Sequence, residues 1–202
     1  MRLIFSLLLL SLAQLAGAQN TPAMEAPAEL PYYQIPDYPA KYNACTVAAR
    51  MLDGLGFRYY WATEGLREED LSYRPNADAR TAAETLDHIY GLVQMVRQAV
   101  QQRPNGSGGE PEPATFADQR RQTLLAIQEV SNILKASKPR DLKKYNIVFQ
   151  RGDNTSEFPF WNVLNGPLAD ALWHVGQVVS FRRGSGNPFN GKASVFSGKV
   201  RE

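Results

Sequence analysis

Four stretches of the chain, each about 20 residues long, place apolar residues at alternating steps of three and four. This spacing puts the apolar side chains on one face of an α-helix. The stretches cover approximately residues 42–67, 81–100, 115–137 and 159–183. Helices that each carry one wide apolar face bury those faces most simply by packing around a common core. The sequence therefore predicts an all-α fold, a four-helix bundle over residues 42–188.

Local signals mark where these helices begin, bend and end. Thr81 and Glu84 form the pattern of a capping box, in which each side chain pairs with a free amide of the first helical turn. Pro159 suits the first turn of the last helix, and residues 184–188 contain the glycines and the proline that end it. The Gly166-Pro167 pair predicts a kink within that helix.

The segments outside the four helices differ in composition. Residues 19–41 contain five prolines, which exclude a helix and predict an extended lead-in. Residues 103–114 have the composition of a linker. Residues 141–158 combine strand-like and turn-like patterns, which predicts a short hairpin or an irregular insert before the last helix. Residues 189–202 form a non-periodic C-terminal tail.

The first 18 residues have the pattern of a secretory signal peptide. Arg2 precedes an apolar run over residues 3–12, and small residues at 16–18 offer a cleavage site after Ala18. The apolar run is shorter than the roughly 20 residues that a stable membrane span requires. We therefore expect an exported protein, periplasmic or secreted, with no stable membrane span after cleavage.

Charge and cysteine content narrow the possible partners and the source of stability. The formal net charge is +2, and removal of Arg2 with the signal leaves +1. A balance so close to zero argues against nucleic acid and against broad binding to anionic membranes. Cys45 is the only cysteine, so an intrachain disulfide is excluded. We expect Cys45 to be a small buried hydrophobic residue.

The candidate site involves both histidines of the chain. Asp170 and His174 are four residues apart on the last helix, so their side chains lie one above the other. His88 and His174 each come one residue before an apolar stripe position, Ile89 and Val175 respectively. Both rings therefore leave a helix at the flank of its apolar face. We expect His88, Asp170 and His174 to converge in a cleft between two helices.

Two imidazoles and one carboxylate form a ligand set that suits zinc, nickel, iron or manganese and leaves positions open for water or substrate. Gln177, one turn beyond His174, is expected to orient a ligand of this site. Arg182, with Arg183, is expected to bind an anionic ligand near the mouth of the pocket. The alternatives are a hydrogen-bonded polar pair without metal, and arginines that cap the last helical carbonyls.

Two further sets of residues carry predictions about packing. The three tryptophans are expected to belong to the core or to the pocket wall; they are Trp61, Trp161 and Trp173. Leu172 and Val179 widen the apolar stripe of the last helix beyond what one core needs. Such surplus apolar residues would suit a homodimer formed through helix faces.

Several of these residues together resemble the DinB-like superfamily. The resemblance rests on "LSYRP" at 71–75 followed by Leu86-Asp87-His88-Ile89, on His174-x-Gly176-Gln177, and on Arg182-Arg183-x-Ser185-Gly186. It covers residues 42–188. That family is a four-helix bundle with three metal-binding histidines, one on the second helix and a His-x3-His pair on the last. The resemblance implies His88 and His174 as ligands, with Asp170 in place of the first histidine of the pair.

Two functional hypotheses follow. The first is an exported DinB-like domain that binds a divalent metal between helices and catalyses a hydrolytic or transfer step on a small molecule. Characterised relatives include transferases that use intracellular low-molecular-weight thiols, but an exported chain meets little of such reduced cosubstrate, so that activity is not carried over. The second hypothesis is a non-enzymatic binding or interaction module that keeps the fold without metal.

Overall fold

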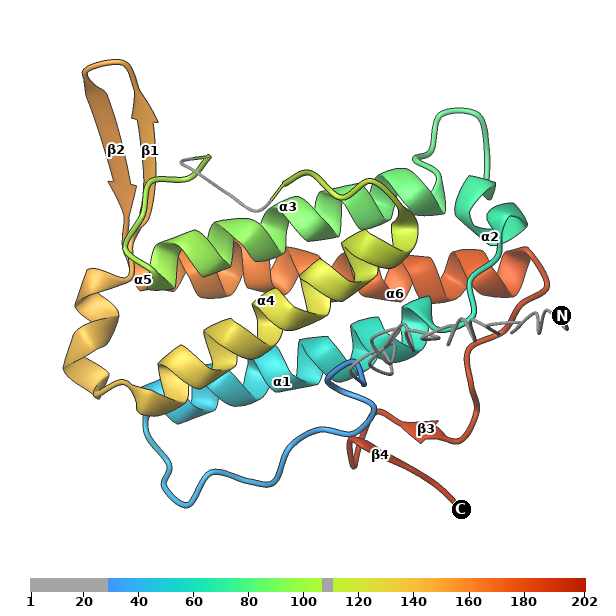
Figure 1. Cartoon of the computed structure of the whole chain (residues 1–202), viewed down its shortest axis with the longest axis horizontal. Helices are drawn as coiled ribbons and strands as arrows, with labels where there is room; N and C mark the ends of the chain where they lie inside the picture. The colour runs from blue at the N-terminus through green and yellow to red at the C-terminus, as the bar shows by residue number, and fades with distance from the viewer. Residues whose placement is uncertain (1–28, 107–110) are drawn as a thin grey trace, which may run out of the picture.

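The computed structural model describes residues 29–106 and 111–202. The predicted signal peptide and its cleavage site lie outside the described residues. Four long helices run along the long axis of the molecule (Figure 1): α1 (Ala44–Thr63), α3 (Ala82–Val100), α4 (Phe116–Ala136) and α6 (Ala169–Gly184). Helix α1 packs against α4 and α6, and α3 packs against the same two helices. The predicted all-α character is confirmed.

The apolar stripes read from the sequence form the core between these helices. The positions that are almost completely buried include Leu52, Leu55, Tyr59, Leu86, Ile89, Val93, Leu124, Ile127, Val130 and Val175. Full burial of one such aliphatic side chain stabilises the fold by about 1.5–3 kcal/mol. The core therefore fixes the rotation of each helix about its axis, and with it the direction of the polar side chains at the flanks.

Side-chain caps set the first residue of three long helices. Asn43 accepts hydrogen bonds from the backbone amides of Cys45 and Thr46 at the start of α1. Thr81 and Glu84 form the predicted capping box at the start of α3. Thr115 accepts from a first-turn amide of α4. Each cap satisfies amides that the helix itself leaves unpaired.

Short elements connect the long helices. Helix α2 (Glu68–Ser72) lies between α1 and α3, where no helix was predicted. A 3-10 helix, η1 (Pro139–Lys144), follows α4. Strands β1 (Ile147–Arg151) and β2 (Asn154–Phe158) then pair antiparallel, as the expected hairpin.

The predicted kink in the last helical stretch is present. Helix α5 (Phe160–Val163) is joined to α6 by a π-helical turn, η2 (Leu164–Leu168). Gly166 has φ −93° and ψ −110°, outside the helical region, and Pro167 has no amide hydrogen to continue the helical ladder. Asp170 consequently lies in the first turn of a new helix, where the helix dipole favours a carboxylate.

Residues 29–41 of the lead-in and the C-terminal tail pack on α1. Tyr32 is 5% exposed and belongs to the main core. Its ring lies over Gly56, where a Cβ atom would come within 2.5 Å of the ring. Strands β3 (Ala193–Ser194) and β4 (Lys199–Val200) form a second hairpin in the tail, and the amide of Ile35 donates to Gly198. The described part of the lead-in and the tail are therefore part of the fold.

The expectation for the tryptophans is wrong at two of three positions. Trp61 is buried, but Trp161 and Trp173 are 77% and 72% exposed. Trp173 is exposed because α6 packs inward through the other side of the helix, where Val175 is buried. Trp161 lies on α5, which buries Phe160 and Val163 instead. Leu172 and Val179, the apolar residues proposed for a dimer face, are half-buried and pack against the core.

Two other expectations concern burial and membranes. Cys45 is fully buried, as predicted, and burial raises the pKa of its thiol. Within residues 29–106 and 111–202, none of the helices has the length and apolar character needed to cross a membrane.

Candidate metal centre

The three predicted ligands lie together. His88 projects from α3, while Asp170 and His174 project from α6. One ligand atom from each residue can be chosen so that all three atoms lie within 4.8 Å of one another. The two imidazole rings are 4.7 Å apart between centroids and nearly perpendicular. Convergence of these residues across 82 positions of sequence is the central geometric feature of the site.

The packing of α3 against α6 explains this convergence. Ile89 on α3 and Val175 on α6 are both buried in the main core, and the two helices pack against each other. His88 and His174 each precede one of these residues, so their rings leave at the edge of the contact. The side chains of His88, Asp170 and His174 are 34%, 36% and 15% exposed respectively. The site is therefore anchored in the helix contact and open to solvent on one side.

Asp170 lies between the two rings. Its Oδ2 atom is 3.2 Å from Nε2 of His88, and its Oδ1 atom is 3.2 Å from Nε2 of His174. Two nitrogen atoms therefore face one carboxylate. A neutral imidazole nitrogen without a proton carries a lone pair, so such a contact needs a proton or another cation to be attractive.

Gln177 determines which nitrogen of His174 carries the proton. Its Oε1 atom accepts a hydrogen bond from Nδ1 of His174 at 2.7 Å. In the neutral ring this places the proton on Nδ1 and leaves the lone pair of Nε2 directed at Asp170. A partner that fixes the tautomer in this way is typical of histidines that bind metal. Gln177 therefore contacts the candidate site through His174.

Arg182 does not lie at the centre, contrary to expectation. Its guanidinium is almost completely buried and donates to the carbonyl oxygens of Trp61 and Ala62 at the end of α1. Its Nε atom donates to the carbonyl of Asn187, and burial lowers the pKa of the group. The carbonyls in the last turn of a helix need partners, and Arg182 supplies them. Arg182 therefore caps helical carbonyls, as the alternative predicted, but the carbonyls belong to α1 and not to its own helix.

A buried carboxylate that sequence reasoning missed accompanies Arg182. Asp70 on α2 is fully buried and accepts from the side chains of Arg67, Ser185 and Asn187. These hydrogen bonds, that of Arg67 first, hold the pKa of Asp70 well below its usual range. The group ties α2 to the end of α6, and gives Ser185 a structural role. Partners more than 100 residues apart leave no periodic signal in the sequence.

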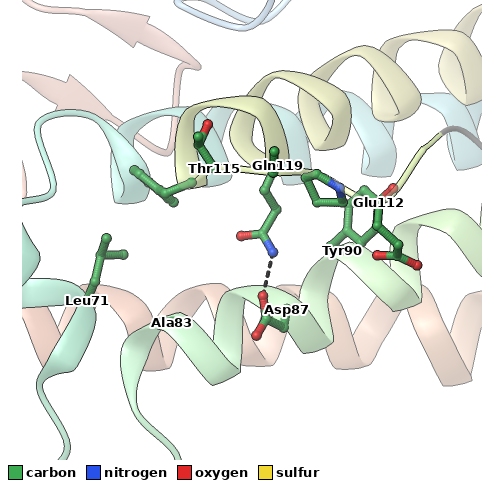
Figure 2. Close-up of a pocket in the computed structure, with 10 residues that line it drawn as sticks. Leu71, Ala83, Asp87, Tyr90, Glu112, Thr115 and Gln119 are labelled. Atoms are coloured by element: carbon green, nitrogen blue, oxygen red, sulfur yellow. Dashed lines mark hydrogen bonds between the residues drawn. The ribbon is translucent and has the colours of Figure 1, made fainter.

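Two cavities border α3. The first, of about 440 Å³, lies between α2, α3 and α4 and is shown in Figure 2. The second, of about 630 Å³, runs along α3 and includes His88 in its lining. Figure 2 shows Gln119 reaching from α4 towards Asp87, whose Oδ1 atom accepts from Gln119 at 2.6 Å. Sequence reasoning gave Asp87 no role of its own, because it carries no spacing signal.

The donor set fits a divalent metal of the borderline class. Two imidazole nitrogens and one carboxylate oxygen match the preferences of zinc, nickel, iron and manganese, and the solvent side leaves room for further ligands. No family model matches this chain, and it has no significant match among curated proteins or solved structures.

Proposed function

We propose that this chain is an exported four-helix bundle of the DinB type that binds one divalent metal through His88, Asp170 and His174. The observation that carries the proposal is the convergence of three donor groups from two helices within 4.8 Å. The closed ring of contacts among α1, α4, α3 and α6 supports the bundle. The signal pattern of residues 1–18 supports export.

A bound divalent metal would supply a Lewis acid that polarises a substrate oxygen. The residues of the chain have distinct parts in this proposal. Gln177 holds the ring of His174 with its Nε2 lone pair directed into the site. Asp170 provides negative charge between the two rings. The partial exposure of the three side chains leaves access for a small molecule, so a hydrolytic or transfer step is the proposed chemistry.

The competing hypothesis, a binding module without metal, also has support. Both Asp170 contacts of 3.2 Å are of hydrogen-bond length and would be attractive if each histidine carried a proton on Nε2. Because Gln177 already accepts from Nδ1, His174 would then be an imidazolium. Trp161 on α5 and Trp173 on α6 are exposed and would be available to a partner of such a module, including a second copy.

Metal analysis separates the two hypotheses. The protein is purified without chelator in three forms: wild type, His174→Ala and Asp153→Asn. Asp153 lies in the exposed turn of the first hairpin and serves as the control. We expect about one equivalent of metal in wild type and in the control, and a loss in His174→Ala. Equal, substoichiometric metal in all three forms would end the metal proposal.

Thermal unfolding gives a second measure. A ligand that binds only the native state adds about 2.7 kcal/mol of stability at 100 times its dissociation constant. Zinc, nickel or manganese should therefore raise the Tm of wild type and leave that of His174→Ala unchanged. The metal-free module predicts no shift in either form.

A further inference from the structure

A groove of about 250 Å³ lies between the lead-in and α1. The lead-in contributes Tyr38, Pro39 and Tyr42 to its lining, and α1 contributes Val47 and Met51. Figure 1 shows the lead-in passing along α1 before that helix begins. The groove therefore has one wall from each of two segments that belong to the fold.

The helical wall is apolar although it does not face the core. Val47 and Met51 are four residues apart, so their side chains lie one above the other on α1. Each comes one residue before a core position, Ala48 and Leu52 respectively, yet both are exposed. Two exposed apolar side chains in line form a second apolar strip on this helix, beside the one that the core uses.

The wall from the lead-in adds aromatic surface to this strip. Tyr38 and Tyr42 are both exposed, and Pro39 between them keeps the backbone extended. Single exposed apolar residues are normal on a protein surface. Apolar residues that gather around a hollow are typical of a binding site.

Two cations line the same groove, and no aspartate or glutamate does. They are Lys41 and Arg50. Within residues 29–106 and 111–202, neither forms an ion pair with a carboxylate. The groove therefore combines apolar walls with positive charge that no acidic side chain of its lining balances.

Arg50 is held in place by the lead-in. Its Nη1 atom donates to the carbonyl oxygen of Pro36 at 2.8 Å, and its guanidinium carbon lies 4.6 Å from the ring centroid of Tyr38. A guanidinium has five N–H donors, so this one hydrogen bond leaves donors for an anion. A cation that is already positioned loses less entropy when it binds an anion.

The charge and the size of the groove restrict the ligand. Apolar walls with cations complement a molecule that is apolar along its body and anionic at one end. A water molecule takes about 30 Å³ in the liquid, so the groove holds a body of about eight water-sized groups. That volume suits one hydrocarbon chain of medium length and is too small for the two chains of a bilayer lipid.

We propose that this groove binds a single-chain anionic amphiphile, an alkyl carboxylate of the fatty-acid type. The carboxylate lies at Lys41 and Arg50, and the chain lies along Val47 and Met51. None of these residues belongs to the metal centre. Binding of the amphiphile is therefore independent of the proposed function and does not require metal.

Three probes of equal chain length test the charge requirement: octanoate, 1-octanol and octylammonium. Binding to the full protein is measured by isothermal titration in the presence of EDTA, so that metal does not contribute. Octanoate should bind at least about tenfold more tightly than 1-octanol, because its carboxylate adds charge-assisted hydrogen bonds. Octylammonium should bind most weakly, since its charge is repelled by the two cations.

Chain length tests the apolar part of the groove. Each buried methylene group tightens binding about fourfold. Butyrate, which has four methylene groups fewer than octanoate, should therefore bind at least about tenfold more weakly than octanoate.

Variants locate the site. Lys41→Gln and Arg50→Gln should each weaken octanoate binding about tenfold and leave the binding of 1-octanol unchanged. Met51→Gln should weaken the binding of both molecules. Arg58→Gln is the matched control, because Arg58 also lies on α1 and donates to one backbone carbonyl, that of Gly54, but does not line the groove. Lys41→Gln stays informative if loss of the contact between Arg50 and Pro36 disturbs the lead-in.

Four results would overturn the proposal. They are octanoate and octylammonium binding equally, no binding of octanoate at millimolar concentration, octanoate binding that none of the three groove variants weakens, and butyrate binding as tightly as octanoate. A protein that binds no octanoate but sediments with phosphatidylglycerol vesicles, and not with phosphatidylcholine vesicles, would replace the single-chain ligand with a membrane surface. Failure of the metal proposal is seen separately, in the metal content of His174→Ala.

Discussion

Replacement of Tyr32 tests whether the lead-in belongs to the fold. Its hydroxyl donates to Oδ1 of Asp53 at 3.1 Å, in a buried group that also contains Ser131 and Lys135. Ser131 donates to the same oxygen at 2.6 Å, and Lys135 Nζ lies 2.9 Å from Oδ2. Oδ2 makes no hydrogen bond of good geometry, so its pairing with Lys135 is ionic. Asp53 would therefore keep two partners if the hydroxyl of Tyr32 were removed.

The expected magnitudes follow from these contacts. A hydrogen bond to a charged group contributes about 1.5–3 kcal/mol, and the two remaining partners of Asp53 place Tyr32→Phe at the low end, about 1.5 kcal/mol. For a domain of this size that lowers Tm by about 3–6 °C. Tyr32→Ala also removes a buried aromatic ring, which costs about 3–5 kcal/mol. Tyr38, 78% exposed in the same lead-in, provides the control.

The assay is urea unfolding followed by circular dichroism, with wild type, Tyr32→Phe, Tyr32→Ala and Tyr38→Ala compared at equal m-value. The order of stability should be wild type and Tyr38→Ala together, then Tyr32→Phe, then Tyr32→Ala. If Tyr32→Ala costs less than about 1 kcal/mol, well below the range for a buried ring, Tyr32 does not occupy the core in solution. The reasoning on the lead-in would then be refuted.

Three other predictions concern acid stability, backbone packing and the tuning of the metal centre. The pKa of Asp70 lies below its unfolded value of about 3.9, so its contribution to stability is present above about pH 4 and is lost as the pH falls further. Asp70→Asn should therefore reduce the change in the urea midpoint between pH 5 and pH 2.5. The same change in wild type and Asp70→Asn would contradict this. Gly56→Ala places a methyl group against the ring of Tyr32 and should destabilise the protein by about 1–3 kcal/mol. Gly91→Ala meets open space in a helix and should stabilise the protein by up to about 1 kcal/mol. If both changes were neutral in the same urea assay, the packing of Tyr32 on Gly56 would be contradicted. Gln177→Ala should weaken metal affinity about 10–100-fold with the Tm of the metal-free protein little changed, and an unaltered affinity in a competition titration would remove the role given to Gln177.

The features that the sequence predicted depend on neighbours along the chain. The 3-and-4 spacing placed the four long helices. The capping box at Thr81 and the Gly166-Pro167 kink were also visible locally. The meeting of His88 with Asp170 and His174 followed from one further step, that a residue beside a buried stripe position leaves a helix at its flank.

The features that the sequence did not predict depend on contacts between distant segments. Arg182 was expected at a pocket mouth, but the unpaired carbonyls at the end of α1 provide its partners. The apolar character of Trp173 suggested burial, whereas the packing direction of α6 leaves it outside. Asp70 and Tyr32 acquire their roles from residues far along the chain. No local period encodes such pairings.

X-ray absorption spectroscopy of the protein loaded with one equivalent of zinc tests the central claim most directly, because it reports the atoms bound to the metal. The account predicts two imidazole nitrogens together with oxygen ligands in wild type, and one imidazole in His174→Ala. A spectrum with oxygen ligands alone, or one identical in wild type and His174→Ala, would contradict the assignment of His88, Asp170 and His174 as a metal centre.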